Sequence, residues 1–337
     1  MIKTNKNLSI EAFRFIIICF ICIWHFDGHG GILQRGYLGV DFFFILSGML
    51  LYKSSIKENA LNSVDYTLKK FFRFFPEYVF CMLFLYICQL FTGSLTLSVE
   101  TIERFISEML MLQNVGLWMD GRNWALWYIC VLIVGGGLIY SFLKYDKRIS
   151  LHVIMPLLVI LGFSFLFKFN KENHIESFAQ SALISLPLLR GLCDMSLGVL
   201  CMAVFIKKKE SMTRFLCLWS VASIISLILF LRQIFVNEND DSYCLIFLPI
   251  LLMSLFLEGT ILNKLFRSKI WIFLGSISFE MYLVHVPILG IINVIKSVFF
   301  INGYILTIIY LCTVFLLAIL LKRMIIILNR FLGVTSL

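Results

Sequence analysis

Long apolar runs separated by short polar segments follow one another along the whole chain, and they constrain the fold more than any other feature. The sequence is 60% hydrophobic and 15% charged, whereas soluble domains are about 45–50% apolar and about 25% charged. A bilayer accepts helices with roughly 17–25 apolar residues, because a helix bonds its own backbone N–H and C=O groups. We therefore predict an all-α, polytopic membrane helix bundle that forms a single domain over residues 1–337.

The runs predict about ten transmembrane helices, of which the second and eighth are short for a full crossing. The predicted spans are 10–26, 37–52, 74–90, 124–143, 153–169, 182–206, 215–231, 243–257, 270–292 and 304–321. The longest loop holds a periodic apolar segment, 102–112, which we expect to lie at the membrane interface.

Lys and Arg residues set the expected orientation. If the N-terminus is cytoplasmic, every inner loop is richer in Lys and Arg than its outer neighbours, and Lys207-Lys208-Lys209 falls inside. The sequence therefore predicts that both termini are cytoplasmic, and the net charge of +9 is explained by topology rather than by a nucleic-acid partner. Cys19 and Cys22 lie in an apolar run without a second ligand pair, so no metal site is predicted.

A few ionisable residues fall inside the predicted spans, where they are costly and hence candidates for function. They are Glu11, Arg14, His25, Asp41, Arg190, Asp194, Glu280 and His285.

The first helix carries the most informative of these residues. Arg14 and His25 are separated by about three turns, or about 16 Å, so they share one face, with Glu11 one turn before Arg14. Asp41, about one turn into the second helix, is expected at the depth of His25, where a carboxylate can orient an imidazole and stabilise its charged form. The alternatives are that Arg14 extends to the inner headgroups while His25 lies in the outer interface beside Trp24, and that Asp41 caps its helix or pairs with Arg35.

Two further groups of charges have functional and structural interpretations. Lys70 and Arg73, with Arg14, are predicted to hold an anionic phosphate ligand at the inner face, although a positive flank of the third helix would look the same. Arg190 and Asp194 are spaced i,i+4 and are predicted to pair. Glu280 and His285 either line a cavity or brace the bundle.

Three motifs resemble those of the acyltransferase-3 family. They are Arg14 and His25 with ten residues between them, the block 39–48 that reads GVDFFFILSG, and Arg73-Phe74-Phe75-Pro76-Glu77-Tyr78. Weaker similarities follow in the same order at 123–126, at 190–192 with Gly198, and at 278–287. These motifs add Ser47, Trp124 and Tyr282 to the candidate substrate or cavity residues, beside Glu11, Arg190, Glu280 and His285.

The resemblance implies about ten helices in a bacterial inner membrane and an acyl-CoA donor, usually acetyl-CoA. It implies a hydroxyl acceptor on lipopolysaccharide, capsule, exopolysaccharide or a lipid-linked glycan. Arg14 and His25 would be the functional pair, with His25 acting as a base supported by Asp41 or as the carrier of a transient acyl group. Lys70 departs from the family pattern, because it keeps the charge of an Arg but loses the bidentate fork. The alternative function is a glycan or lipid transporter, although we find no repeated half.

Overall fold

The computed structural model describes residues 6–27, 31–91, 93–96, 98–116, 121–170, 174–175, 180–181, 184–236, 240–298 and 302–331. Apart from a two-stranded antiparallel ribbon, β1 (Gln180–Ser181) with β2 (Ile184–Ser185), the regular elements of these residues are helical. Nine helices in this part of the chain are long and apolar enough to cross a bilayer. The predicted all-α membrane fold is confirmed, and the chain is an integral membrane protein. The cytoplasmic placement of its termini stays a prediction.

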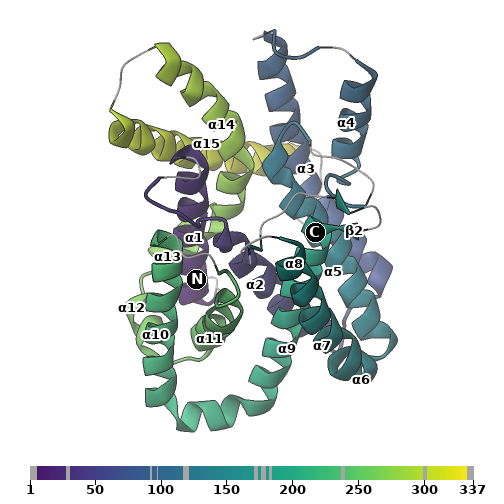
Figure 1. Ribbon diagram of the computed structural model, residues 1–337, viewed down its shortest axis with the longest axis vertical. Helices are drawn as coiled ribbons and strands as arrows, with labels where there is room; N and C mark the ends of the chain where they lie inside the picture. The colour runs from purple at the N-terminus through teal and green to yellow at the C-terminus, as the bar shows by residue number, and fades with distance from the viewer. Residues whose placement is uncertain are drawn as a thin grey trace. The chain divides into compact units, whose positions relative to one another are not determined.

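Figure 1 shows the order of the elements along the chain. The helices are α1 (Leu8–Asp27), α2 (Leu38–Ser55), α3 (Ser63–Phe91), α4 (Val99–Met109), η1 (Trp124–Leu126), α5 (Trp127–Tyr145), α6 (Lys147–Ile149), η2 (Ser150–Ile154), α7 (Met155–Leu157), η3 (Leu158–Gly162), α8 (Phe163–Phe169), α9 (Leu186–Arg214), α10 (Leu216–Phe235), α11 (Cys244–Phe256), α12 (Ile261–Leu265), α13 (Ile270–Ser276), α14 (Ser278–Val298) and α15 (Gly303–Phe331).

The helices differ from the predicted spans mainly at their ends. α3, α9 and α15 continue well beyond the apolar runs, because a helix that leaves the bilayer can keep its backbone hydrogen bonds in polar sequence. The predicted helix 270–292 is instead two helices, α13 and α14, which are separated at Ile277. The eighth run is α11, a helix of 13 residues that falls below the length of the nine candidate spans. The predicted start of the sixth span at Ala182 lies outside the described residues.

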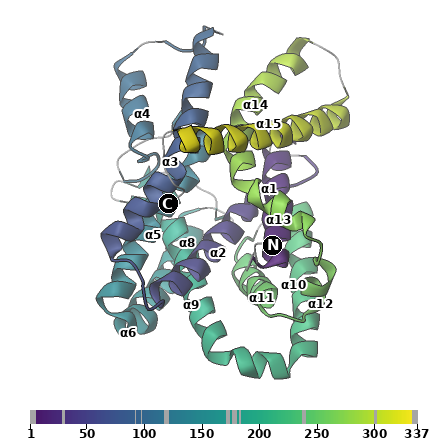
Figure 2. The ribbon, with the colours of Figure 1, turned by 180° about the vertical axis from the view of Figure 1, so that it is seen from behind.

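The described residues group into two compact units. Unit 1 holds residues 1–61, 138–177 and 189–276, and unit 2 holds residues 62–137, 178–188 and 277–337. In unit 1, α10, α11, α12 and α13 lie around α1, as Figures 1 and 2 both show. In unit 2, α14 packs on α15 and on α3. The assignment of the whole chain to a single domain stays a prediction.

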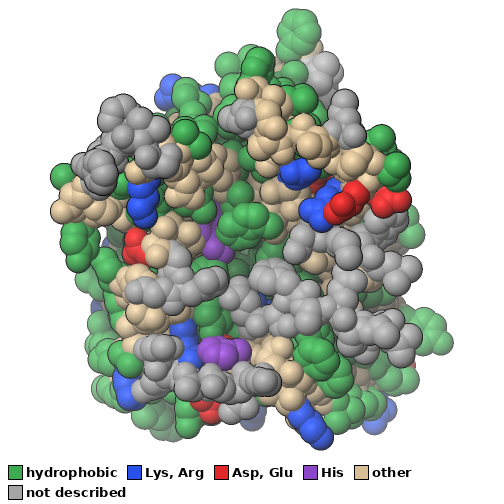
Figure 3. All heavy atoms as spheres, turned by 45° about the horizontal axis from the view of Figure 1, so that its top comes forward, with side chains coloured by type: hydrophobic (Ala, Val, Ile, Leu, Met, Phe, Trp, Pro, Cys, Tyr) green, Lys and Arg blue, Asp and Glu red, His purple; other side chains and the backbone are tan. Residues whose placement is uncertain are grey.

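The surface has the character expected of a protein that lies in lipid. Leu218 of α10, and Ile308 and Leu316 of α15, are each at least 60% exposed. Figure 3 shows broad hydrophobic patches on one face, with charged side chains few and scattered among them. An exposed apolar surface of this extent is stable in a bilayer and unfavourable in water.

The amphipathic segment of the long loop forms α4, which begins with a cap from the Ser98 side chain. This helix exposes Val99 and Ile102 and buries Glu108. Its apolar side therefore faces away from the rest of unit 2. That orientation agrees with the predicted position at a membrane interface.

Candidate active site

Glu11 and Arg14 lie on one face of α1, in unit 1, as their spacing of three residues predicts. Arg14 Nη1 is 3.1 Å from Glu11 Oε2, with Glu11 buried and the Arg14 side chain 28% exposed. Gly275 of α13 packs directly against Glu11, and a Cβ atom at Gly275 would overlap the Glu11 carboxylate. Glu11 therefore orients Arg14, whose guanidinium stays partly accessible.

His25 lies in the last turn of α1, half-buried. Its ring centroid is 4.5 Å from that of Trp24, and the Trp24 ring is 5.2 Å from the Tyr37 ring in an edge-on arrangement. Arg14 and His25 thus lie on the same helix, about 16 Å apart along its axis. An imidazole in this place can act as a general base or as a nucleophile.

Asp41 pairs with Arg190 across two helices. Arg190 Nε donates to Asp41 Oδ1 at 2.8 Å, and Nη2 donates to Oδ2 at 2.7 Å and to the Tyr37 carbonyl at 3.2 Å. Both side chains are at most 2% exposed. The bidentate partner of Arg190 is thus on α2 rather than on its own helix, and no hydrogen bond from Arg190 to Asp194 is found among the described residues. Asp194 still interacts electrostatically with Arg190, so the predicted ion pair stays a prediction. Arg35, considered above as a partner for Asp41, binds Asp241 instead.

Two glycines allow the approach of α2 to α9 that this pair requires. A Cβ atom at Gly48 would overlap the backbone of Met195, and a Cβ atom at Gly198 would overlap the backbone of Ile45. Asp41 stands near the start of the GVDFFFILSG block and Gly48 ends it. Gly48 allows the two helices to come close, and Asp41 binds Arg190 across their contact. Ser47 lies beside Gly48, half-buried.

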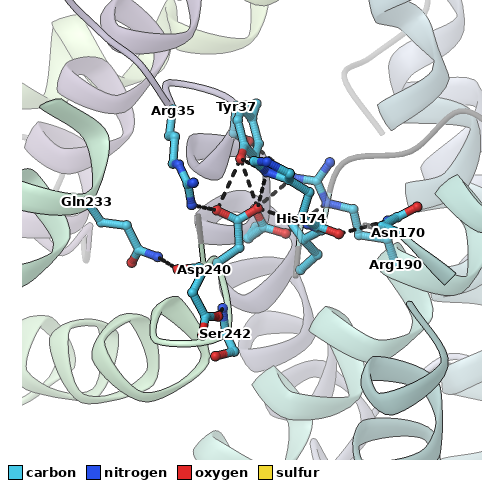
Figure 4. A network of polar contacts seen from close by, with 11 residues as sticks. Arg35, Tyr37, Asn170, His174, Arg190, Gln233, Asp240 and Ser242 are labelled. Atoms are coloured by element: carbon cyan, nitrogen blue, oxygen red, sulfur yellow. Dashed lines mark hydrogen bonds and ion pairs between the residues drawn. The ribbon is translucent and has the colours of Figure 1, made fainter. Parts of the chain in front are cut away.

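A second buried network, centred on Asp241, lies at the start of α2 (Figure 4). The Asp241 carboxylate is 2.5 Å from Arg35 Nη1, and it accepts hydrogen bonds at 2.8 Å from the Tyr37 hydroxyl and from the Ile175 backbone N–H. The His174 Nδ1 atom is 3.2 Å from the Tyr37 hydroxyl. Sequence reasoning missed Asp241 and His174, because both lie in loops without periodicity.

Lys70 and Arg73 belong to unit 2, on one face of α3. The Lys70 Nζ atom lies 5.7 Å from the ring centroid of Tyr66 and 6.0 Å from that of Phe74, and the Arg73 guanidinium lies 5.8 Å from the Phe74 ring. Cations held over ring faces keep their positive charge available to an anion on the other side. This arrangement is compatible with binding a phosphate group.

Trp124, Tyr282 and His285 come together in unit 2. The His285 ring is 6.1 Å from the Trp124 ring and 5.4 Å from the Tyr282 ring, and its Nδ1 atom is 2.6 Å from the Tyr282 carbonyl. The Tyr282 hydroxyl donates to the Ala125 carbonyl. The segment after the long loop is thereby fixed to α14, with a fully buried imidazole at the junction.

Glu280 forms an ion pair with Lys322 of α15 at 3.2 Å. The Glu280 residue is 5% exposed. This pair braces α14 against α15, which is one of the two roles that the sequence left open for Glu280.

Comparison with known proteins identifies the family of the chain. The profile of the acyltransferase 3 family, described as an acyltransferase domain, matches residues 7–323. The chain belongs to the acyltransferase 3 family. No curated protein and no solved structure matches it. As an acyltransferase 3 protein it is a membrane transferase that uses an acyl donor and an acceptor, and the family match includes every candidate residue in both units.

Proposed function

We propose that the protein is an O-acyltransferase that moves an acyl group, most simply acetyl, from cytoplasmic acyl-CoA to a glycan hydroxyl. The acceptor is a surface polysaccharide, such as lipopolysaccharide, capsule or exopolysaccharide, or a lipid-linked glycan, and the site of action is a bacterial inner membrane. The observation that carries the proposal is the pairing on α1 of a partly exposed guanidinium, Arg14, with a half-buried imidazole, His25, about 16 Å further along. A donor with its phosphates at Arg14 needs a long arm to bring an acyl group to His25, and acyl-CoA has one.

The proposed reaction assigns His25 the role of general base. The His25 imidazole takes the proton of the acceptor hydroxyl as the oxygen attacks the thioester carbonyl. The C–S bond then breaks, and the imidazolium returns the proton to the coenzyme A thiolate. In the second version a His25 nitrogen attacks the thioester carbonyl, the C–S bond breaks and coenzyme A leaves as the thiolate. The acceptor oxygen then attacks the acyl-imidazole, the ester forms, the hydroxyl proton passes to the thiolate, and the free imidazole is regenerated.

The other candidate residues support this reaction in the proposal. Arg14, Lys70 and Arg73 bind the donor phosphates. Asp41, whose two oxygens each bind Arg190, contributes by fixing the start of α2 near Trp24 and His25. Ser47, Trp124, Tyr282 and His285 are assigned to the cavity or to substrate binding. Glu11, Arg190 and Glu280 support the site through their ion pairs with Arg14, Asp41 and Lys322.

The test uses purified protein in nanodiscs with radiolabelled acetyl-CoA and a panel of glycans. The wild type is expected to transfer label to a glycan, and His25→Ala is expected to lose transfer while keeping its thermal unfolding midpoint. His152→Ala is the matched control, because His152 is exposed on a helix away from these contacts. A folded and fully active His25→Ala protein would refute both versions of the mechanism.

Arg14→Gln separates donor binding from chemistry. We expect it to raise the dissociation constant for acetyl-CoA about tenfold or more, because a charge-assisted hydrogen bond to a phosphate is lost. Arg104→Gln is the control, because Arg104 pairs with Glu100 on α4. If the wild type neither transfers label nor binds acetyl-CoA, the transporter alternative takes the place of this proposal.

A further inference from the structure

Among the described residues, the contact between α2 and α9 holds two carboxyl groups, Asp41 and Asp194, and one cation, Arg190. Asp41, Arg190 and Asp194 are at most 2% exposed, and the Arg190 guanidinium gives two hydrogen bonds to Asp41. Asp194 lies one turn of α9 beyond Arg190 and interacts electrostatically with the Asp41 carboxyl. Neither Asp194 oxygen receives a hydrogen bond from a nitrogen or hydroxyl donor among the described residues.

In the part of the chain that the structure describes, no further cation is seen to bind this cluster. The Cys193 thiol donates to the Leu158 carbonyl, and the Cys244 thiol is buried. In the neighbouring network Asp241 pairs with Arg35, and His174 Nδ1 lies 3.6 Å from Asp241 Oδ2. Tyr37 links this network to the cluster. If Asp41 and Asp194 were both ionised, the cluster would therefore carry one uncompensated negative charge.

Its position makes such a charge unfavourable. Asp194 lies about 12 Å along α9 from Leu186, inside a helix that is long enough to cross the membrane. An ion in this environment loses its hydration and gains no partner, which costs several kcal/mol. Two adjacent carboxyls resolve the same conflict in other proteins by holding one proton between them.

We propose that Asp194 and Asp41 form a proton-binding site that holds one proton on Asp194 and keeps Asp41 ionised for Arg190. Asp41 is the ionised member because it accepts both guanidinium hydrogen bonds, which favour the charged form. The protonated Asp194 donates its O–H to an Asp41 oxygen, which has a second lone pair free for it. The cluster then contains one positive and one negative charge, and each carboxyl has a hydrogen-bond partner.

Infrared spectroscopy of the protein in nanodiscs tests the proposal without an acyl donor or acceptor, so its outcome is independent of the proposed function. Wild-type protein at neutral pH is expected to show the carbonyl stretching band of a protonated carboxyl group. Asp194→Glu should shift this band, and Asp194→Asn should remove it while keeping the unfolding midpoint, because the amide replaces the O–H donor. Glu103→Gln, at an exposed carboxylate, should leave the band unchanged. A wild-type spectrum without the band would overturn the proposal.

A monovalent metal cation is the competing occupant, and thermal unfolding distinguishes it. The unfolding midpoint of the wild type is expected to be the same in sodium, potassium and N-methylglucamine chloride at equal ionic strength. A midpoint that rises in one of the metal salts, and does not rise in Asp194→Asn, would assign the site to a metal ion and overturn the proton. If Asp194→Asn does not fold, the wild-type band and its shift in Asp194→Glu decide alone.

Discussion

Arg190 on α9 binds Asp41 on α2 with two hydrogen bonds, of 2.8 and 2.7 Å, inside the contact between these helices. We expect Arg190→Gln and Asp41→Asn each to lower the free energy of unfolding by about 3–5 kcal/mol, because each leaves a buried charge without its partner. The double variant should cost clearly less than the sum of the two, since it removes both charges. Denaturant titrations in detergent micelles measure the four free energies of the cycle.

The matched control for this cycle is a more exposed ion pair with a similar N···O distance. Arg104 Nη2 lies 2.7 Å from Glu100 Oε1, with the two side chains 33% and 68% exposed. The variant Arg104→Gln should lower the free energy of unfolding by about 0–1 kcal/mol. Additive effects at Arg190 and Asp41, or equal costs for the buried and exposed pairs, would show that the buried pair does not hold α2 to α9.

The glycine contacts between α2 and α9 give a second prediction. Gly48→Ala and Gly198→Ala should each lower the free energy of unfolding by about 1–3 kcal/mol, because the new methyl group meets backbone rather than a flexible side chain. Gly290→Ala is the control, since nothing lies within 4 Å of the position of its Cβ atom. That helical substitution should be neutral or stabilising by up to about 1 kcal/mol. The same cost at all three positions would argue against close helix packing.

The hydroxyl of Tyr37 ties the start of α2 to Asp241, and Tyr37→Phe removes that bond while keeping the ring against Trp24. We expect the free energy of unfolding to fall by about 1.5–3 kcal/mol, the usual value for a hydrogen bond to a charged group. Tyr304→Phe, at an exposed ring, should have no measurable effect. An unchanged Tyr37→Phe protein would show that the Asp241 network is held by Arg35 and the backbone alone.

Glu108 gives a pH dependence outside the membrane-spanning helices. Burial raises the pKa of the Glu108 carboxyl above its ordinary value of 4.5, although donors such as the Asn123 N–H, 3.2 Å from Oε1, work against the shift. The folded protein thus binds this proton more tightly than the unfolded chain, so its contribution to stability is fully present below pH 4.5. The contribution is lost as pH rises through the pKa of the folded state.

Glu108→Gln should remove this part of the pH dependence and leave the protein at least as stable at neutral pH, because the amide oxygen can still accept the Asn123 N–H. Thermal unfolding between pH 4 and pH 8 measures the difference between the variant and the wild type. The exposed Glu103→Gln is the control. Parallel curves for Glu108→Gln and the wild type would contradict the prediction.

The membrane helices could be predicted from the sequence because a bilayer requires long apolar runs, and hydropathy measures that directly. Hydropathy did not predict where the helices end, nor the break between α13 and α14. The charged stretch 207–214 continues α9 as a helix, and the apolar sequence around Ile277 conceals the separation of α13 from α14. Hydropathy averages over a window and reports neither backbone hydrogen bonding nor a single interrupted turn.

The candidate site could be predicted only as far as single helices allow. The shared face of Glu11 and Arg14 follows from helical spacing, and the structure contains that contact. The true partner of Arg190 did not follow, because its neighbour on the same helix, Asp194, is visible in the sequence, whereas Asp41 is brought close only by the glycine contacts of two distant helices. The catalytic role of His25 stays a prediction.

The ion pair between Arg35 and Asp241 joins residues that are 206 positions apart in the chain. A ribosome adding about 5–20 residues per second needs roughly 10–40 s to make the second residue after the first. During that interval Asp241, in the α10–α11 connection, has not yet been made. Arg35, which lies between the first two helices, therefore stays hydrated and unpaired with this carboxylate. The contact between Arg35 and Asp241 can therefore form only after Asp241 has been synthesised. A nascent chain arrested before Asp241 would lack this ion pair, and its first helices would be more accessible to quality-control proteases.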